Sequence, residues 1–263
     1  MLESELGILG HLNNLQACRE VATWSDGGSA LDHGGVLIVA TRSTFPVLAN
    51  LAFRTDVDVS GKTAIEAAQR FFGERDRGFT VLVREQPDDS DLEAAAVDAG
   101  LALFMDHYPE MICRARLKDC EAPDGVVVRR AVTIADIEDT FAVILDAYPS
   151  LGFPVEELAL TFGLPHRLLR PQIGIVNAYA DEQPVGTAMT VLSHGVAGVY
   201  WVATVGSARG RGVGESVTRA ATNWGFDNGA RMQSLQPSSM GEPIYRRMGY
   251  EEVFNYRMYV QFR

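Results

Sequence analysis

The feature that most constrains this chain is a glycine-rich loop in its C-terminal half. Residues 198–205 are rich in β-branched and aromatic side chains, which predicts a strand, and residues 215–228 have the amphipathic pattern of a helix. The loop between them contains Arg209-Gly-Arg-Gly-Val-Gly214. This order favours anion binding, because the first amides of a helix have no intrahelical partners and the helix dipole adds about half a positive charge there.

The residues of the loop narrow the class of anion site. Gly212 and Gly214 lack the Cβ atoms that would keep a pyrophosphate away from the amides, and Arg209 and Arg211 add positive charge. The loop does not end in Gly-Lys-Ser/Thr, which excludes a Walker loop. Its glycines also lack the Gly-x-Gly-x-x-Gly order of a dinucleotide site. The pattern that remains is Arg-x-x-Gly-x-Gly.

The elements predicted after residue 125 alternate between strands and helices. Thr133 and Asp136 form a near capping box at one helix start, Pro149 ends that helix near Tyr148, and Gly229 follows the end of a later helix. This order predicts a mixed α/β sheet rather than a doubly wound one. The predicted strands are residues 126–130, 173–180, 185–193, 198–205, 232–236 and 252–262, and the helical segments are residues 133–148, 155–170, 215–228 and 243–248.

The loop resembles the acetyl-CoA signature (Gln/Arg)-x-x-Gly-x-(Gly/Ala) of the GNAT superfamily of N-acetyltransferases, with Arg209, Gly212 and Gly214 at its defining positions. The resemblance extends over residues 126–262. Residues 126–136 resemble the first strand and helix start of that family, residues 202–205 its fourth strand, and residues 244–250 its closing Tyr-x-x-x-Gly-(Phe/Tyr) element. The resemblance implies a GNAT acyl-CoA N-acyltransferase fold in this half.

The resemblance also implies a mechanism and its residues. Acetyl-CoA would be the cosubstrate, with no metal, and the acceptor amine would attack the thioester directly. Amides near Ala203 and Val205 would polarise the thioester carbonyl and pair with pantetheine. Tyr245, with an unperturbed pKa near 10, would be the general acid to the thiolate. The implied cofactor-binding residues are Ala203, Thr204, Val205, Arg209, Gly210, Arg211, Gly212, Val213 and Gly214.

The general base is not identified by the sequence, because the strand 198–205 contains no acid. Candidates are Glu156, Glu157, His166 and His194, and a water chain or the C-terminal carboxylate would serve equally. Successive side chains of a strand face opposite sides, so either Tyr200 or Trp201 is expected to face the acceptor. The aromatic residues Tyr148, Phe153 and Phe162 are further candidates for its wall.

The N-terminal half repeats part of this plan. A turn-rich segment at residues 118–125 predicts a boundary between domains 1–120 and 121–263. The predicted helices are residues 63–72 and 92–99, and the predicted strand segments are residues 78–84, 101–104 and 111–114. If Gly100 corresponds to Gly249, then Ala96 stands at the position of Tyr245, and Asp56 and Asp58 lie where a phosphate loop would be. We therefore expect two tandem copies, the first degenerate; the alternative is an unrelated N-terminal domain.

Composition excludes several functional classes. The formal net charge is −11 and no basic stripe is present, which argues against nucleic-acid binding. No stretch approaches the ~18 apolar residues that span a bilayer, and acids precede any basic residue at the N-terminus, so a cytoplasmic protein is expected. Cys18, Cys113 and Cys120 are scattered, which predicts free thiols.

Three functions are compatible with these observations. The first is an N-acetyltransferase for a primary amine of a small molecule or peptide. The second is a non-catalytic acyl-CoA-binding sensor or pseudoenzyme, suggested by the missing base. The third is a nucleotide-phosphate binder that uses the same loop. The sequence leaves open both the acceptor and the oligomeric state, a homodimer among the options.

Overall fold

The computed structural model describes residues 3–85 and 89–263, and its contacts divide the chain into two compact units. Unit 1 contains Met1–Ala17, Glu110–Val155 and Leu164–Val253, and unit 2 contains Cys18–Pro109, Glu156–Gly163 and Phe254–Arg263. The units therefore differ from the contiguous ranges 1–120 and 121–263 that the sequence predicts. The difference arises because α1, β5 and β11 each contribute residues to both units and residues 156–163 belong to unit 2.

The elements of the chain are, in order, α1 (Glu3–Trp24), β1 (Ser29–His33), β2 (Val36–Ala40), β3 (Asn50–Arg54), α2 (Gly61–Gly73), β4 (Phe79–Arg84), α3 (Ser90–Asp98), β5 (Ala102–Cys113), β6 (Val126–Arg130), α4 (Ile134–Ala147), η2 (Tyr148–Leu151), α5 (Val155–Thr161), η3 (Pro165–Leu168), β7 (Ile173–Ala180), β8 (Gln183–Ser193), β9 (Val196–Thr204), η4 (Gly206–Ala208), α6 (Val213–Asp227), β10 (Met232–Leu235), α7 (Glu242–Met248) and β11 (Glu251–Gln261).

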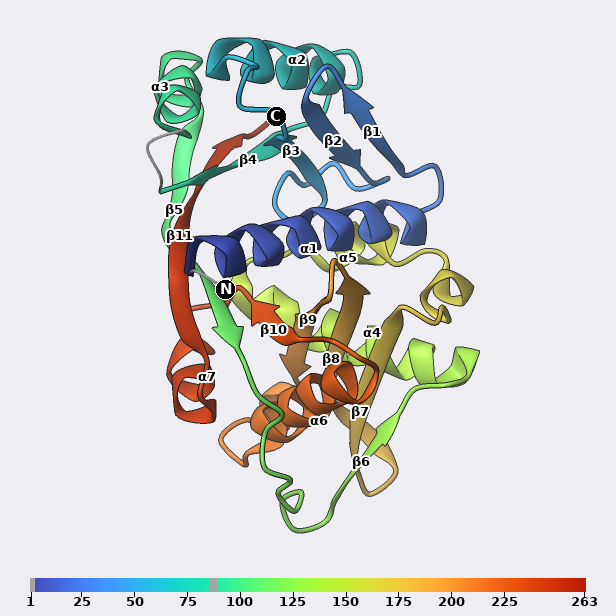
Figure 1. Cartoon of the computed structure of the whole chain (residues 1–263). Helices are drawn as coiled ribbons and strands as arrows, with labels where there is room; N and C mark the ends of the chain where they lie inside the picture. The colour runs from blue at the N-terminus through green and yellow to red at the C-terminus, as the bar shows by residue number, and fades with distance from the viewer. Residues whose placement is uncertain (1–2, 86–88) are drawn as a thin grey trace. The chain divides into compact units, whose positions relative to one another are not determined.

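The sheet of unit 1 has the strand order β6-β7-β8-β9-β10-β5 (Figure 1). Strands β6 to β9 are antiparallel, β10 is parallel to β9, and the end of β5 is antiparallel to β10. Two helices cover opposite faces. Val176 and Ala178 of β7 belong to the core under α6, whereas the residue between them, Asn177, accepts a 2.9 Å hydrogen bond from Thr140 of α4.

The sheet of unit 2 repeats this pattern in the order β1-β2-β3-β4-β11. Strands β1 to β3 are antiparallel, β4 is parallel to β3, and β11 is antiparallel to β4. Helix α2 follows β3 as α6 follows β9, and its Ile65 and Phe72 pack in a core with Val81. The repeat agrees with the predicted internal duplication, which itself stays a prediction.

The outer antiparallel strand of each unit comes from the opposite half of the sequence. Residues 111–113 of β5 pair with β10 in unit 1, and residues 256–261 of β11 pair with β4 in unit 2. Each strand satisfies the open edge of a parallel strand, which would otherwise expose unpaired backbone groups. Residues 101–104 and 111–114, predicted as separate strand segments, therefore belong largely to one strand.

Local signals place most element ends. Thr133 caps α4 in a full capping box with Asp136, and Gly229 follows α6 with φ +89°. The elements α1, β1, β2 and β3 were not predicted from the sequence. In α1 the buried face carries Asn13, Asn14 and Glu20, which interrupt the apolar stripe that would mark a helix.

Candidate functional site

A cleft of about 380 Å³ lies in unit 1, where β9 ends and α6 begins. It is lined by residues from β9, the loop 206–212, the first turn of α6, the end of α4 and α7. Most of the residues predicted to bind the cofactor lie here. These are Ala203, Thr204, Arg209, Gly210, Gly212, Val213 and Gly214, together with the predicted acid Tyr245. Val205 and Arg211 do not line the cleft.

The first turn of α6 is open toward the cleft. The helix begins at Val213, two residues before the predicted start, because Gly212 adopts φ +83° and its carbonyl accepts the first helical hydrogen bond, from Ser216. Within the described part of the chain, no side chain caps this helix. The amides of Val213, Gly214 and Glu215 therefore keep the donor capacity that a helix start offers to an anion.

Glycine is required at two positions of this loop. Gly210 and Gly212 have φ of +75° and +83°, values that other residues adopt only with strain. At Gly214 an added Cβ would lie 3.2 Å from Thr204 Oγ1 and would narrow the space over the amides. The loop therefore has the shape expected of a cradle for a pyrophosphate, with no Cβ at the points of closest approach.

Strand β9 carries an irregularity next to the cleft. Its pairing with β8 jumps from Thr187↔Ala203 to Met189↔Tyr200, so that two residues of β9 oppose one of β8. Trp201, inside this bulge, has φ +53°, which is uncommon for an aromatic residue. The extra residue changes the direction of the last residues of β9.

The same part of β9 separates from β10. The parallel pairing covers only Val196–Gly198 against Met232–Ser234. In the described parts of the chain, residues 199–204 have no ladder partner on β10. The two strands thus part at Gly198 and Ser234, and the cleft begins beyond this point, between Val202 and Ser238.

The backbone directions in β9 correct one sequence prediction. The amide of Val205 donates to Val185 O at 3.0 Å, so it is not available to a thioester. Because hydrogen-bonded pairs alternate along an antiparallel ladder, the amide of Ala203 points to Thr187 in the same way. By the same alternation, the amide of Thr204, one of the predicted residues, points away from β8 toward the separated edge. The prediction of donors near Ala203 and Val205 is therefore narrowed, because Val205 is excluded and Thr204 remains.

Tyr245 lies on α7 and lines the cleft with only 8% of its surface exposed. Burial raises its pKa to about 12, against a smaller lowering by a hydrogen bond with Thr218. The pKa of Tyr245 is therefore higher than the unperturbed value expected from the sequence. The phenol is protonated at pH 7 in either case. A Cβ at Gly241 would lie 2.8 Å from the ring, so this glycine lets the tyrosine pack against the start of its own helix.

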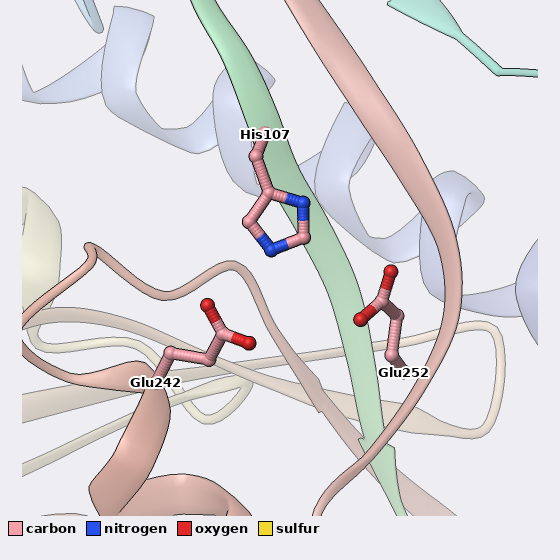
Figure 2. A group of neighbouring side chains, drawn as sticks. All are labelled: His107, Glu242 and Glu252. Atoms are coloured by element: carbon pink, nitrogen blue, oxygen red, sulfur yellow. The ribbon is translucent and has the colours of Figure 1, made fainter.

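Ion pairs hold α7 against β11. Arg246 Nη2 lies 2.7 Å from both Glu242 Oε1 and Glu252 Oε2. Figure 2 shows these two carboxylates facing one another from α7 and β11. Arg246 is the next residue after Tyr245, so the pairs help to fix the position of the phenol.

Sequence and structure comparisons agree with this geometry. Residues 192–253, which include β9, the cradle loop and α7, match the family model described as acetyltransferase (GNAT) domain. The fold is that of the GNAT acyltransferases. A GCN5-related N-acetyltransferase from Kribbella flavida has a similar structure, with a TM-score of 0.72 and 23% identity over 97% of this chain and 95% of that chain.

Two further GNAT structures resemble the chain at lower identity. A GCN5-related N-acetyltransferase from Sphaerobacter thermophilus has a TM-score of 0.63 and 15% identity over 88% of this chain and 82% of its own. A tandem GNAT protein from the clavulanic acid biosynthesis pathway has a TM-score of 0.60 and 12% identity over 88% and 81%. No curated protein matches the chain in sequence. Among the described residues, no helix has the length and apolar character needed to span a bilayer.

The arginines of the GNAT loop differ in their surroundings. The guanidinium of Arg209 donates to Thr204 O at 3.2 Å, to Ala147 O at 3.3 Å and to Ser150 Oγ at 2.7 Å. It therefore ties the loop to the ends of β9 and α4, and direct contact with a phosphate stays a prediction. Arg211 is exposed outside the cleft.

The predicted bases do not gather at the GNAT cleft. Glu157 is occupied within unit 2, where it accepts hydrogen bonds from Ser43 Oγ and Thr44 N, each at 2.7 Å. His194 lies in the turn before β9, about 33 Å along an extended strand from Thr204. Glu156 and His166 are exposed, and neither lines the cleft.

The predicted aromatic residues separate into two groups. Trp201 and Phe153 both contact Tyr148, a residue of the cleft, at ring centroid distances of 5.4 and 5.6 Å. Phe162 belongs to the core of unit 2, where it stacks on Trp24 at 6.0 Å. Of the pair on β9, Tyr200 donates to Asn13 Oδ1 at 2.7 Å, so Trp201 is the one beside the cleft.

The corresponding helix start in unit 2 is filled by side chains. Ser60 caps α2 by accepting from Thr63 N at 3.2 Å, and Asp91 Oδ2 accepts from Gly61 N at 2.6 Å. Arg54 Nη1 lies 2.6 Å from the same Asp91 carboxylate. The sequence predicts that pyrophosphate is excluded here because the Arg-x-x-Gly-x-Gly pattern is missing and Asp56 and Asp58 lie nearby. In the structure, the residue that occupies the helix start is Asp91, from α3.

Proposed function

We propose that the chain is an acetyl-CoA-dependent N-acetyltransferase that acylates a primary amine of a small molecule or peptide. The observation that carries the proposal is the uncapped start of α6, with Gly212 at φ +83°, beside a cleft that runs to the separated strands β9 and β10. The amides of Val213, Gly214 and Glu215 are the proposed donors to the pyrophosphate.

The pantetheine arm would follow the free edge of β9. The amide of Thr204, which faces this edge, and that of Val202 in the adjoining bulge are the proposed donors for the pantetheine amides and the thioester oxygen. Hydrogen bonds from fixed amides cost no reorganisation during the reaction, so they stabilise the charge that develops on that oxygen. The bulge at Trp201 supports this proposal because it sets the direction of these two amides.

Tyr245 is the proposed donor to the departing sulfur. As the amine nitrogen bonds to the acetyl carbon and the carbon–sulfur bond breaks, negative charge passes to the sulfur. A thiol with an ordinary pKa of about 8.5 is a stronger acid than a phenol with a pKa of about 12. Complete proton transfer from Tyr245 is therefore uphill, and its main contribution is a hydrogen bond to the forming thiolate.

The aromatic residues beside the cleft support a cationic acceptor. Tyr148, Phe153 and Trp201 form a contiguous group, and aromatic faces attract ammonium groups by about 0.5–2 kcal/mol. An amine that enters as an ammonium ion must then lose a proton before it attacks. We propose this group as one wall of the acceptor site.

The test is release of free thiol from acetyl-CoA in the presence of polyamines, aminoglycosides, amino acids and peptides. Release that depends on the amine, with formation of the acetylated product, is the expected result. A chain that binds acetyl-CoA tightly but releases no thiol with any amine would instead be a non-catalytic acyl-CoA sensor. That alternative is favoured by one observation: none of the bases predicted from sequence lines the cleft. Competition by ATP as strong as that by coenzyme A would indicate a nucleotide site.

A further inference from the structure

A carboxyl group that the proposed reaction has not used lies buried in unit 1. Glu110, near the end of β5, has no exposed surface. Its Oε2 accepts a hydrogen bond from Gln236 Nε2. Its Oε1 is buried and has no hydrogen-bond partner among the described residues. An unsatisfied buried carboxylate oxygen is costly, so its retention calls for an explanation.

Strand register places Glu110 next to the point where β9 and β10 separate. Leu235 of β10 pairs with Met111, so the following residue, Gln236, stands opposite Glu110. The last residue of β10 that pairs with β9 is Ser234, and the cleft includes Ser238. Glu110 therefore lies on the strand next to β10. Its register is that of Gln236, which stands between Ser234, the last residue of β10 paired with β9, and Ser238, which lines the cleft.

The Glu110 side chain lies on the face of the sheet opposite α6. Leu235 and Met111 belong to the core under α6, so their neighbours Gln236 and Glu110 face the opposite side of the sheet. That side carries α1, and a side chain at Gly10 of α1 would collide with Glu110 Oε1. Tyr200 of β9 also contacts α1, through Asn13. The carboxyl group thus faces away from α6, whose first turn holds the proposed cradle.

The surroundings of Glu110 favour proton uptake. Burial raises its pKa to about 8, while the hydrogen bond from Gln236 and the neighbouring Ser234 hydroxyl lower it by less. The groups that face the carboxylate are neutral. They are Ser234 on β10, Gln236 directly after β10, and Gly10 on α1. No charged residue is among the causes of the shift. A group of this acidity can take a proton from an amine near neutral pH.

We infer that Glu110 is the terminal proton acceptor of the proposed transfer, reached from the separated strands through the neighbouring Ser234 hydroxyl. This inference rests on the proposed function. The amine nitrogen forms a bond to the acetyl carbon and loses one proton, which passes to the Glu110 carboxylate. The carbon–sulfur bond breaks, and its electron pair leaves with the sulfur, which takes up one proton from solvent, while Glu110 returns the amine's proton to solvent before the next turnover. Because Glu110 reaches the amine only through Ser234, it is a positioning residue and does not touch the substrate itself.

The test compares Glu110→Gln, Glu110→Asp and wild type over pH 6 to 10, with an amine that the wild type acetylates. General-base contributions are typically about 10²–10⁴-fold. We expect Glu110→Gln to lower kcat at least about 100-fold, with unchanged acetyl-CoA affinity and no inflection of kcat near pH 8. Glu110→Asp should restore part of the rate together with the inflection. Ser234→Ala should lower kcat in the same direction and keep the carboxyl titration in a ¹³C NMR experiment.

A matched control is Asp136→Asn, which changes a carboxyl group of unit 1 that serves a helix cap. It should reduce the melting temperature and leave the shape of the pH profile unchanged. A folded Glu110→Gln variant with the wild-type kcat and pH profile would overturn the role of Glu110 and leave the acetyltransferase proposal in place. If Glu110→Gln does not fold, a Ser234→Ala variant with unchanged kcat and profile would overturn it equally. A wild type that releases no thiol with any amine would overturn both.

Discussion

The starts of α6 and α2 show two outcomes of one structural plan. Each helix follows the last strand of an antiparallel run, β9 for α6 and β3 for α2, and precedes a strand that is parallel to it. At α6 no side chain caps the helix and the first amides border a cleft. At α2 the Ser60 hydroxyl and the Asp91 carboxylate accept from the first turn. Asp91 thus supplies within the protein the negative charge that a bound phosphate would supply at α6.

An anion site can therefore be lost because side chains of the protein occupy it, as well as because nearby negative charges repel the anion. Arg54 is almost fully buried and bonds both Asp91 and Asp89, so it fixes the carboxylate over the start of α2. A backbone approach by α3 completes the closure, because a Cβ at Gly61 would collide with Leu92 and Asp91. In unit 1 the residues 206–214 and the separated β9 and β10 keep the equivalent space open.

The largest effect is expected from breaking the closure in unit 2. Arg54→Leu leaves Asp89, which is 3% exposed, with Arg84 as its remaining ionic partner. Removing one partner of a buried pair costs about 3–5 kcal/mol, so we expect the free energy of unfolding in urea to fall by about 3 kcal/mol. Acetyl-CoA affinity should not change. Arg116→Leu, which removes exposed ion pairs with Asp119 and Asp227, should lower the free energy of unfolding much less. Equal losses in the two variants would contradict the assigned role of Arg54.

A second difference between the units is Tyr245, because Ala96 stands at its position in unit 2 if Gly100 corresponds to Gly249. Tyr245→Phe should lower kcat by about 10- to 100-fold, because a hydrogen bond to a charged group contributes about 1.5–3 kcal/mol. The phenol is buried, so the melting temperature is a necessary control. Full retention of kcat in a folded variant would remove Tyr245 from the reaction and leave the cradle unaffected.

The cradle itself is tested by Gly214→Val. The added side chain would crowd Thr204 and the space over the amides, and we expect the acetyl-CoA dissociation constant to rise at least tenfold, or about 1.4 kcal/mol. A matched control is Gly163→Val, since an added Cβ there meets nothing nearer than 3.8 Å. Isothermal titration calorimetry measures both constants. An unchanged constant for a folded Gly214→Val chain would count against the pyrophosphate site.

The smallest effect is expected for Asp91→Asn, which removes the internal charge at α2. A hydrogen bond from the Gly61 amide holds the pKa of Asp91 below its usual range, and hydrogen bonding and charge attraction from Arg54 act in the same direction. The carboxylate therefore stabilises the fold above its unfolded pKa, and this contribution is lost as pH falls through the lower folded pKa. We expect a loss of about 0.3–1 kcal/mol at pH 7. The loss should disappear in strong acid, and a pH-independent difference would contradict the charge assignment.

Much of the site could be predicted because its determinants are local. The order of strand, glycine loop and helix lies within about 30 residues, and Arg209, Gly212 and Gly214 carry both the conformation and the resemblance. The errors concern neighbours that are distant in sequence. Within the predicted residues 203–205, Val205 is excluded as an amide donor because the pairing of β9 with β8 uses its amide. Glu110 was missed because its position beside Gln236 comes from the pairing of β5 with β10.

The sequence by itself determined the elements of the C-terminal half, the capping of α4 by Thr133 and the cradle at the start of α6, since each depends on contacts a few residues apart. Tertiary structure alone decided that β5 completes unit 1 and β11 completes unit 2, that Asp91 fills the start of α2, and that Glu110 is buried beside the cleft. The physical reason is that strand pairing and the desolvation of a carboxyl group depend on residues brought together only by folding.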